Sequence, residues 1–348
     1  MKFDTSSIDQ RAFAKELAAA YSVSIASLTF TPKGEEAFCY VARETDGHEY
    51  FVRAQDRAPI SDLEAVYAAV AALHNRCGLT QALAPLRTVG GTFTWRYERF
   101  TVALFPFVAG TTAFDAGITD EQLDRLARIM AYLHGCDARR RPPMTCEQFD
   151  NPFERTIQRA LAAAASLPVN ASGHRQRVRA LLLEQQADIE ATLTHMRQLR
   201  DDAHRLRPPL VPTHGDPNLA NVLIDETGQL HLTDWGEVAI GPRERDLTFF
   251  TGERFAPFLE TYLDHFGPIR LHRHFFRFYF YRWTVQEIAD YVSRILFGST
   301  DAEHAEYAWE ELQPYLPIQH DGIRDGLDHV ISVLRPFADD GRIKLDDR

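Results

Sequence analysis

Residues 214–236 read HGDPNLANVLIDETGQLHLTDWG and form the densest polar stretch of the chain. Two short apolar runs lie inside it, at 222–225 and at 230–233, and the loop 226–229 separates them. Short runs that flank a loop containing glycine are typical of a β-hairpin. The sequence therefore predicts a hairpin that carries polar side chains on both sides of its open end.

The pairing across this hairpin decides which polar side chains face each other. If Asp225 lies opposite Leu230, Asn221 lies opposite Asp234 at the open end. Directly opposed residues share one face of a sheet, with their Cβ atoms about 4.5–5.5 Å apart. We therefore expect Asn221 and Asp234 to lie side by side, and a register slip of one residue would break this arrangement.

Oxygen atoms of Asn221 and Asp234 would suit a hard cation, since Mg²⁺ prefers one or two protein oxygens and substrate phosphates. Asp216 lies in the loop that leads to the same end, where a carboxylate can accept the proton of a substrate hydroxyl during phosphoryl transfer. A catalytic triad lacks a nucleophile, because no Gly-x-Ser-x-Gly occurs. A zinc site of His214, Asp216 and Asp234 would give Asn221 no role.

The first hundred residues carry β-strand signals. Runs rich in β-branched and aromatic residues predict antiparallel strands at 23–31, 37–43, 49–54, 87–89 and 92–105. Gly90-Gly91 is expected to join the last two. A helix is expected from Ser61 onwards, with Glu64 placed for a capping box.

The spacing of apolar residues becomes helical beyond residue 110, and the hairpin is the one interruption by strands that the pattern predicts. The change of periodicity predicts an α+β chain in three parts. We expect a β-rich lobe at 1–104, a hinge at 105–110, and a mainly helical lobe at 111–348.

The chain of 348 residues has a net charge of −11, and 45% of its residues are hydrophobic. An acidic surface argues against nucleic-acid and anionic-membrane partners, because these are bound by an excess of Lys and Arg. A cationic or metal-bound ligand suits the charge better, although solubility alone explains many acidic proteins. The acidic N-terminus and the lack of a long apolar run predict a cytoplasmic protein. Four scattered cysteines are expected to be reduced thiols.

His214-x-Asp216-x-x-x-x-Asn221, followed thirteen residues later by Asp234-x-Gly236, resembles the catalytic and metal-binding loops of the protein-kinase-like fold. With Gly215 in place of the Arg of protein kinases, the motif is similar to that of the aminoglycoside phosphotransferase family, which also includes homoserine and choline kinases. GPRERDL at 241–247 and TVQEI at 284–288 look most like the spectinomycin phosphotransferase branch, and KGEEAF at 33–38 is similar to hygromycin phosphotransferases.

This resemblance implies a two-lobed fold, in which a small antiparallel sheet precedes a mainly helical lobe with one catalytic hairpin. It also implies ATP and Mg²⁺ as cofactors. Asp216 matches the catalytic base, and Asn221 and Asp234 match the two metal ligands. His214 and Asp246 match residues that brace the catalytic loop.

The resemblance places nucleotide-binding residues in the β-rich lobe. Arg53 stands where the family has a phosphate-binding Lys, and Glu64 stands where the ion-pair partner of that Lys belongs. An Arg keeps the charge, but its planar fork differs from an ammonium group. Arg53 could instead be a solvated strand-end residue and Glu64 a simple capping residue. Gly34 lies in the place of the nucleotide-covering turn, and backbone groups near Phe107 and Val108 would recognise adenine.

Three acids are candidates for binding a cationic substrate, and each could equally be a solvated surface residue. They are Glu237, three residues after Asp234, and Glu287 and Asp290, which share a helix face at i, i+3 spacing. We expect a kinase, monomeric or dimeric, that phosphorylates a small hydroxylated compound. The first candidate is an aminoglycoside or aminocyclitol antibiotic such as spectinomycin, which would make the protein an antibiotic-resistance enzyme.

Other functions remain open. A metabolite kinase acting on homoserine, choline or a sugar, and a bacterial stress-response Ser/Thr protein kinase, would use the same motif. A silent kinase-fold binding module is the alternative without catalysis. The intact Asp216, Asn221 and Asp234 argue against it, whereas Arg53 in the place of the Lys keeps it open.

Overall fold

The computed structural model describes residues 7–32, 37–56, 60–137, 143–167, 173–298 and 302–346. Contacts divide the chain into two compact units. The first unit consists of Met1–Cys146, Val211–Gly241 and Pro257–Phe266. The second consists of Glu147–Leu210, Pro242–Ala256 and Gly267–Arg348.

The first unit begins with a five-stranded antiparallel sheet in the order β1-β2-β3-β5-β4. Its strands are β1 (Ile25–Thr31), β2 (Phe38–Glu44), β3 (Glu49–Asp56), β4 (Trp95–Tyr97) and β5 (Phe100–Pro106). The run predicted as one strand at 92–105 is broken, because the chain turns at Glu98 with φ +49° to form the β4–β5 hairpin. No strand forms at 87–89, which lies within the described part of the chain.

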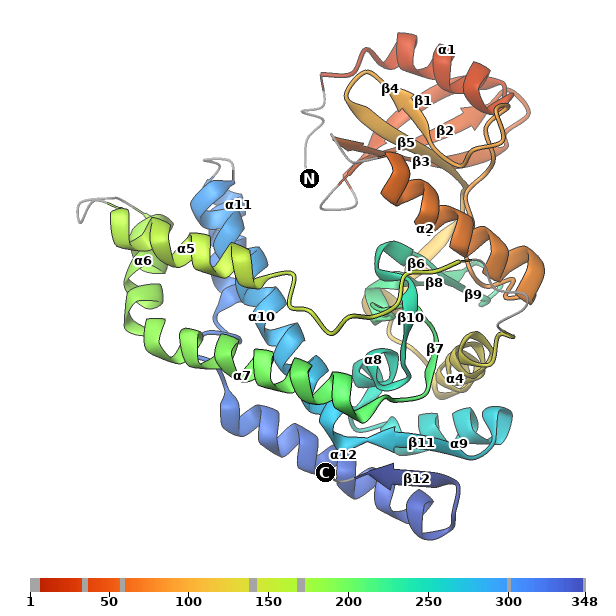
Figure 1. Ribbon diagram of the computed structural model, residues 1–348. Helices are drawn as coiled ribbons and strands as arrows, with labels where there is room; N and C mark the ends of the chain where they lie inside the picture. Colours follow the sequence, from red (N-terminus) through yellow and green to blue (C-terminus); the bar gives the residue numbers. More distant parts are fainter. Residues whose placement is uncertain are drawn as a thin grey trace. The chain divides into compact units, whose positions relative to one another are not determined.

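Helices α1 (Gln10–Tyr21) and α2 (Ile60–Ala72) lie on opposite sides of this sheet (Figure 1). Strand β5 is buried on both faces because its side chains alternate between the two helices. Val102 packs in one cluster with Phe13 of α1. Its neighbour Ala103 packs in another cluster with Tyr67 of α2. The sheet therefore carries two apolar layers.

The rest of the first unit holds the predicted hairpin. Strands β8 (Val222–Asp225) and β9 (Leu230–Leu232) form it, and β6 (Gly110–Thr112) adds a third strand beside β8. Gly110 is required there, since a Cβ would lie 2.2 Å from the carbonyl oxygen of Ile224. The other elements are η1 (Leu73–Cys77), α3 (Ala113–Ala116), α4 (Asp120–His134), β7 (Leu210–Thr213), η2 (Leu219–Asn221), η3 (Trp235–Glu237), β10 (Ala239–Pro242) and α9 (Phe255–Phe266).

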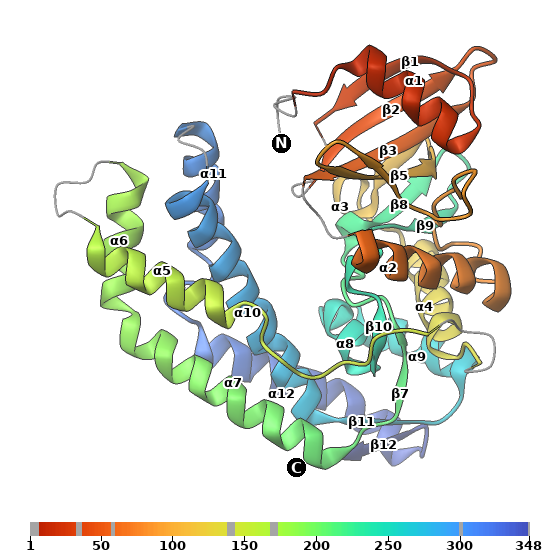
Figure 2. The same cartoon turned by 45° about the horizontal axis from the view of Figure 1, so that its top comes forward.

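The second unit is mainly helical, and its longest helix is α10 (Arg273–Phe297). Figure 2 shows α10 beside the neighbours against which it packs: α5 (Glu154–Ser166), α7 (Gln186–Leu206), α11 (Ala302–Leu312) and α12 (His320–Asp339). One apolar cluster joins these helices and includes Phe275, Phe278 and Ile288 of α10. The unit is completed by α6 (His174–Glu184), α8 (Glu244–Leu247), η4 (Thr248–Phe250), β11 (Ile269–His272) and β12 (Ile343–Asp346).

The predicted α+β class is confirmed, with a five-stranded antiparallel sheet before a mainly helical remainder. The expectation of a single hairpin beyond residue 110 is wrong, because β6 extends the hairpin sheet and the pairs β7–β10 and β11–β12 add two small sheets. These strands have only three or four residues each, too few to show an alternating pattern. The lobe boundaries at 104 and 110 stay a prediction; the five-stranded sheet and residues 110–146 belong to one contact unit. Within the described ranges, no helix is long and apolar enough to cross a bilayer.

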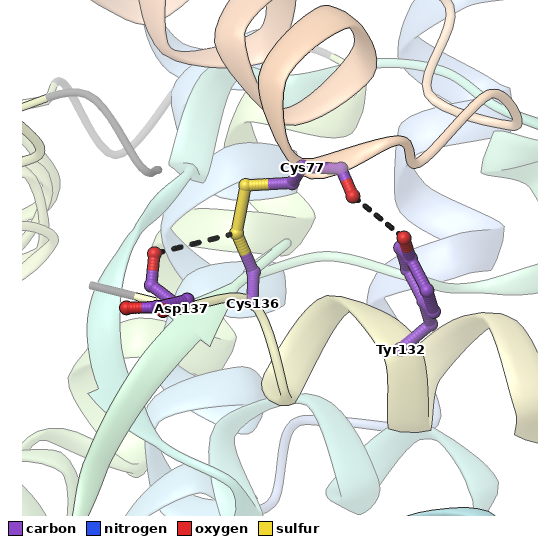
Figure 3. The surroundings of a disulfide bond; sticks show 4 residues. All are labelled: Cys77, Tyr132, Cys136 and Asp137. Carbon is purple, nitrogen blue, oxygen red and sulfur yellow. Dashed lines mark hydrogen bonds between the residues drawn. A yellow bond between two sulfur atoms is a disulfide. The ribbon is translucent and has the colours of Figure 1, made fainter. Parts of the chain in front are cut away.

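The expectation that all four cysteines are thiols is wrong for two of them. Cys77 and Cys136 form a disulfide with a Cα–Cα distance of 5.9 Å (Figure 3). The hydroxyl of Tyr132 on α4 donates a hydrogen bond to the carbonyl oxygen of Cys77 at 2.6 Å. The two cysteines are 59 residues apart, so only the packing of the helix end at Cys77 near the end of α4 brings them together. Cys39 and Cys146 remain thiols.

Candidate active site

The register of the β8–β9 hairpin differs from the predicted one by one residue. Val222 lies opposite Leu232 and Ile224 opposite Leu230. The turn explains the slip. Asp225 Oδ1 accepts hydrogen bonds from the backbone N–H groups of Thr227 and Gln229, both at 2.9 Å, so the loop closes at Gln229 rather than at Leu230.

This slip means that Asn221 is not the strand partner of Asp234. The backbone carbonyl of Asn221 instead accepts the N–H of Thr233 at 2.9 Å. Asn221 ends the short helix η2, and Asp234 adopts a left-handed conformation with φ +54° just before η3. Both residues therefore lie in turns at the open end of the hairpin, outside the paired strands.

Asp216 is held by two amide groups, one on each carboxylate oxygen. Asn218 Nδ2 donates to Oδ1 at 2.7 Å, and Asn221 Nδ2 donates to Oδ2 at 3.0 Å. Burial raises the pKa of Asp216 above its usual value, and the charge of Asp234 acts in the same direction, whereas the two amide hydrogen bonds oppose this shift. Asp216 thus interacts with both predicted metal ligands.

His214 connects the catalytic loop to the strand that precedes Asp234. Its ring is fully buried and lies 4.2 Å from the ring of Trp235 between centroids. Nδ1 accepts the backbone N–H of Asp216 at 3.3 Å, so Nε2 carries the proton and donates to the carbonyl of Thr233 at 2.9 Å. Strand β7, which ends at Thr213, pairs with β10 and delivers His214 to this position.

Arg53 reaches the same group of residues from the five-stranded sheet. Its Nη1 donates to Asp234 Oδ1 at 2.8 Å, and the Arg53 side chain is 20% exposed. Arg53 is therefore not the solvated strand-end residue that the sequence left as an alternative. It brings a guanidinium group to the predicted metal ligand.

The predicted ion pair between Arg53 and Glu64 is not formed. Glu64 instead accepts the backbone N–H groups of Phe93 and Thr94, each at 2.9 Å, and the hydroxyl of Thr94 at 2.8 Å. These donors lie in the loop before β4 and satisfy the carboxylate locally. Glu64 therefore fastens α2 to this loop. Helix α2 begins at Ile60, one residue ahead of the predicted start.

The other residues predicted to bind the nucleotide were chosen because of their place in the family pattern. Gly34 lies outside the described residues. Phe107 and Val108 directly follow β5 and are half-buried, and the N–H of Phe107 donates to the carbonyl of Glu49 at 3.3 Å. Because this N–H is already bonded, an adenine ring near Phe107 would contact the carbonyl group of Phe107 rather than its N–H.

Asn221 and Asp234 fit a hard metal ion. Asn221 Nδ2 donates to both the backbone and the side-chain oxygen of Asp216, which turns Oδ1 of the amide away from Asp216. Among the described residues, no donor is bonded to this Oδ1 or to Asp234 Oδ2. One amide oxygen and one carboxylate oxygen are the kind of ligands that Mg²⁺ takes together with phosphates.

The other predicted residues lie in different surroundings. Asp246 is fully buried in α8 of the second unit. Glu237 is exposed in η3, the turn that follows Asp234. On α10, Asp290 accepts a hydrogen bond from Arg294 Nε at 3.1 Å, and Glu287 is hydrogen-bonded to Tyr291. Asn218, which binds Asp216, was not predicted; its place two residues after Asp216 was the only signal.

Comparisons with known proteins show which family the chain belongs to. The model of the phosphotransferase enzyme family, APH, matches residues 32–279. Protein StrN of Streptomyces griseus is 31% identical over 316 residues, which cover 83% of this chain and 86% of StrN.

Solved structures share the fold at low sequence identity. Spectinomycin phosphotransferase APH(9)-Ia, in complex with ADP and spectinomycin, has a TM-score of 0.72 at 16% identity, over 94% of this chain and 99% of its own. Amicoumacin kinase hAmiN, in complex with AMP-PNP, Ca²⁺ and its ligand Ami, has a TM-score of 0.55 at 12% identity, over 90% of this chain and 96% of its own. The family match and the identity with StrN together show that the chain belongs to the phosphotransferase enzyme family, as an ATP-dependent phosphotransferase with an alcohol group as acceptor.

Proposed function

We propose that the protein transfers the γ-phosphoryl group of ATP to a hydroxyl of a small cationic compound, with an aminoglycoside or aminocyclitol such as spectinomycin as the first candidate. The observation that carries the chemistry is the group around Asp216. A half-buried carboxylate with an amide on each oxygen lies beside a second carboxylate that Arg53 binds. The residues that we propose as general base, metal ligands and phosphate-binding cation all belong to the first compact unit.

Asp216 would take the proton of the acceptor hydroxyl as its oxygen attacks the γ-phosphorus. The bond from phosphorus to the bridging oxygen breaks, and ADP leaves with that electron pair. Asn221 Oδ1 and Asp234 would hold Mg²⁺, which supplies positive charge to the phosphate oxygens when bound. His214 keeps the loop in place through its two hydrogen bonds.

Arg53 would bind phosphate oxygens with its guanidinium group. The ion pair between Arg53 and Asp234 keeps this cation within reach of the proposed metal site. Because Arg has several N–H donors in one plane, it can contact Asp234 and a phosphate oxygen at the same time. The Arg in the usual place of Lys is therefore compatible with catalysis.

The proposal for the substrate rests on charge and on relatives. The net charge of −11 favours a cationic acceptor. The fold is similar to that of an enzyme solved with spectinomycin, and StrN is a relative along most of the chain. We propose that Glu237, in the turn after Asp234, contributes negative charge to the acceptor site. Glu287 would add to the overall negative charge that attracts a cationic acceptor. Asp290 would contribute less, because Arg294 neutralises it.

A substrate panel tests the proposed function. Purified protein with ATP and Mg²⁺ is offered aminoglycosides, aminocyclitols including spectinomycin, homoserine, choline and sugars, and phosphorylated products are measured by mass spectrometry. We expect a product from the cationic antibiotics and raised resistance of a sensitive bacterial host that expresses the protein. Products from homoserine or choline alone would refute the antibiotic substrate and keep the mechanism. Absence of nucleotide binding in calorimetry would refute both.

A further inference from the structure

Asn218 connects the proposed catalytic base with the turn that presents a proposed metal ligand. Its Nδ2 donates to Asp216 Oδ1 at 2.7 Å. Its Oδ1 accepts the backbone N–H of Ala220 at 2.8 Å. Asn218 is thereby the N-cap of η2, the short helix that ends at Asn221. The two polar atoms of one amide group thus make two different contacts.

The two amides that hold Asp216 are not equivalent. Asn221 binds Oδ2 of Asp216, and its own Oδ1 is proposed to bind the metal. The position of Asn221 therefore depends on the metal ion as well as on Asp216. Asn218 uses its amide donor for Asp216 alone and its oxygen for the backbone of η2. It is the contact that can hold the carboxylate whether or not the metal is present.

A carboxylate held through one oxygen can rotate about its Cβ–Cγ bond, whereas a carboxylate held through both cannot rotate without losing a hydrogen bond. A reacting group must point at the acceptor oxygen within narrow limits, because displacement of about 1 Å can cost about 10²-fold in rate. Loss of the Asn218 contact would also leave Oδ1 of a half-buried carboxylate without this donor.

We propose that Asn218 is a positioning residue for phosphoryl transfer. Its amide N–H holds the Asp216 carboxylate in the reactive orientation, and its amide oxygen caps the turn that presents Asn221. The inference rests on the proposed role of Asp216 as general base. It adds a residue with two functions: the N–H group of its amide holds Asp216, and the oxygen of the same amide caps the turn.

Two variants separate these functions. Asn218→Ser keeps an oxygen that can cap η2, because Ser is as good an N-cap residue as Asn, but lacks the amide donor and is too short to replace it. Asn218→Ala removes both contacts. Asn151→Ala is a matched control in the second unit, since Asn151 Oδ1 accepts the backbone N–H of Phe153, also two residues ahead, at 3.1 Å.

Turnover is measured with the acceptor that the panel identifies, or as slow ATP hydrolysis if none is phosphorylated, and binding of ADP with Mg²⁺ is measured by calorimetry. We expect Asn218→Ser to lower kcat about 10- to 100-fold, with the Kd for ADP within about twofold of the wild type. Asn218→Ala is expected to show the same loss and, in addition, weaker metal-dependent ADP binding. Asn151→Ala should keep the kcat and Kd of the wild type.

Unchanged kcat in both Asn218 variants would overturn the inference, as would a loss of kcat that only follows a loss of folded protein in thermal unfolding. Asp216→Ala separates this outcome from failure of the proposed function. If Asp216→Ala abolishes turnover and the Asn218 variants do not change it, only the positioning role is wrong. If Asp216→Ala also retains full turnover, the proposed function is wrong and the inference fails with it.

Discussion

The acids of the catalytic hairpin and those of α10 differ in how far along the chain their basic partners lie. Asp234 is bound by Arg53, which is 181 residues away in the chain and comes from another sheet. Asp290 is bound by Arg294, four residues further along the same helix. A carboxylate whose partner lies one helical turn away is neutralised by local spacing alone. A carboxylate whose partner comes from a distant segment is neutralised only because the fold brings the two segments together.

Replacement of Asp216 should give the largest effect and tests whether the hairpin acids are catalytic. Asp216→Asn keeps the size of the side chain but cannot accept the proton of the acceptor. We expect kcat to fall about 10²- to 10⁴-fold, while calorimetry still detects ADP binding. Asp290→Asn is the control on α10 and should keep at least half of the turnover. A fall of less than tenfold in Asp216→Asn would place the base elsewhere.

The disulfide is a second long-range contact of the first unit. Cys77→Ser should lower the free energy of unfolding by about 4 kcal/mol, because a cross-link over 59 residues restricts the unfolded chain. Urea unfolding at equilibrium measures this loss. Cys146→Ser removes a thiol outside this disulfide and serves as the control. Equal stability of the Cys77→Ser variant and the wild type would show that the bond contributes nothing.

Glu244 makes the stability of the second unit depend on pH. Burial raises the pKa of Glu244 to about 7, although a hydrogen bond from the N–H of His272 acts to lower it. The native state then keeps a proton that the unfolded state loses, so the free energy of unfolding falls as the pH rises towards 7, by up to about 1.4 kcal/mol per pH unit. Above pH 7 this contribution no longer changes. Unfolding of Glu244→Gln between pH 5 and 8 should lack this slope; an identical pH profile would disprove the assignment.

Arg53 tests whether the long-range ion pair serves nucleotide binding. Charged hydrogen bonds contribute about 1.5–3 kcal/mol, so Arg53→Ala should raise the KM for ATP about 10- to 100-fold, and Arg53→Lys should recover part of the loss. Arg43→Ala is the matched control, since Arg43 binds Glu49 on the neighbouring strand at 2.9 Å. Wild-type ATP kinetics in Arg53→Ala would make Arg53 a purely structural residue.

The smallest effect concerns the acids of α10 themselves. Glu287→Gln should raise the KM for a cationic acceptor by up to about fivefold. Asp290→Asn should change it less, because Arg294 already neutralises Asp290. The KM for ATP is the internal control in both variants and should stay constant. A larger effect of Asp290 than of Glu287 would contradict the role of the local ion pair.

Much of the catalytic loop could be predicted because its elements are local. The hairpin, the loop and the order of Asp216, Asn221 and Asp234 lie within 21 residues, in which short-range propensities and turn residues dominate. The register could not be predicted, since it depends on how Asp225 closes its turn. The contact of Asn218 with Asp216 is equally close in sequence, but an Asn after a Pro predicts no particular hydrogen-bond partner.

The sequence by itself determined the α+β class, the position of the hairpin and the family motif, because composition, periodicity and spacing are properties of neighbouring residues. Only the tertiary structure decided the partners that come from distant segments: Arg53 on Asp234, Glu64 on the loop at Phe93, and Cys77 on Cys136. Each of these contacts depends on the packing of whole strands and helices. A side chain forms its ion pairs and hydrogen bonds with the groups that the packing brings closest. The spacing of residues along the chain does not predict these partners.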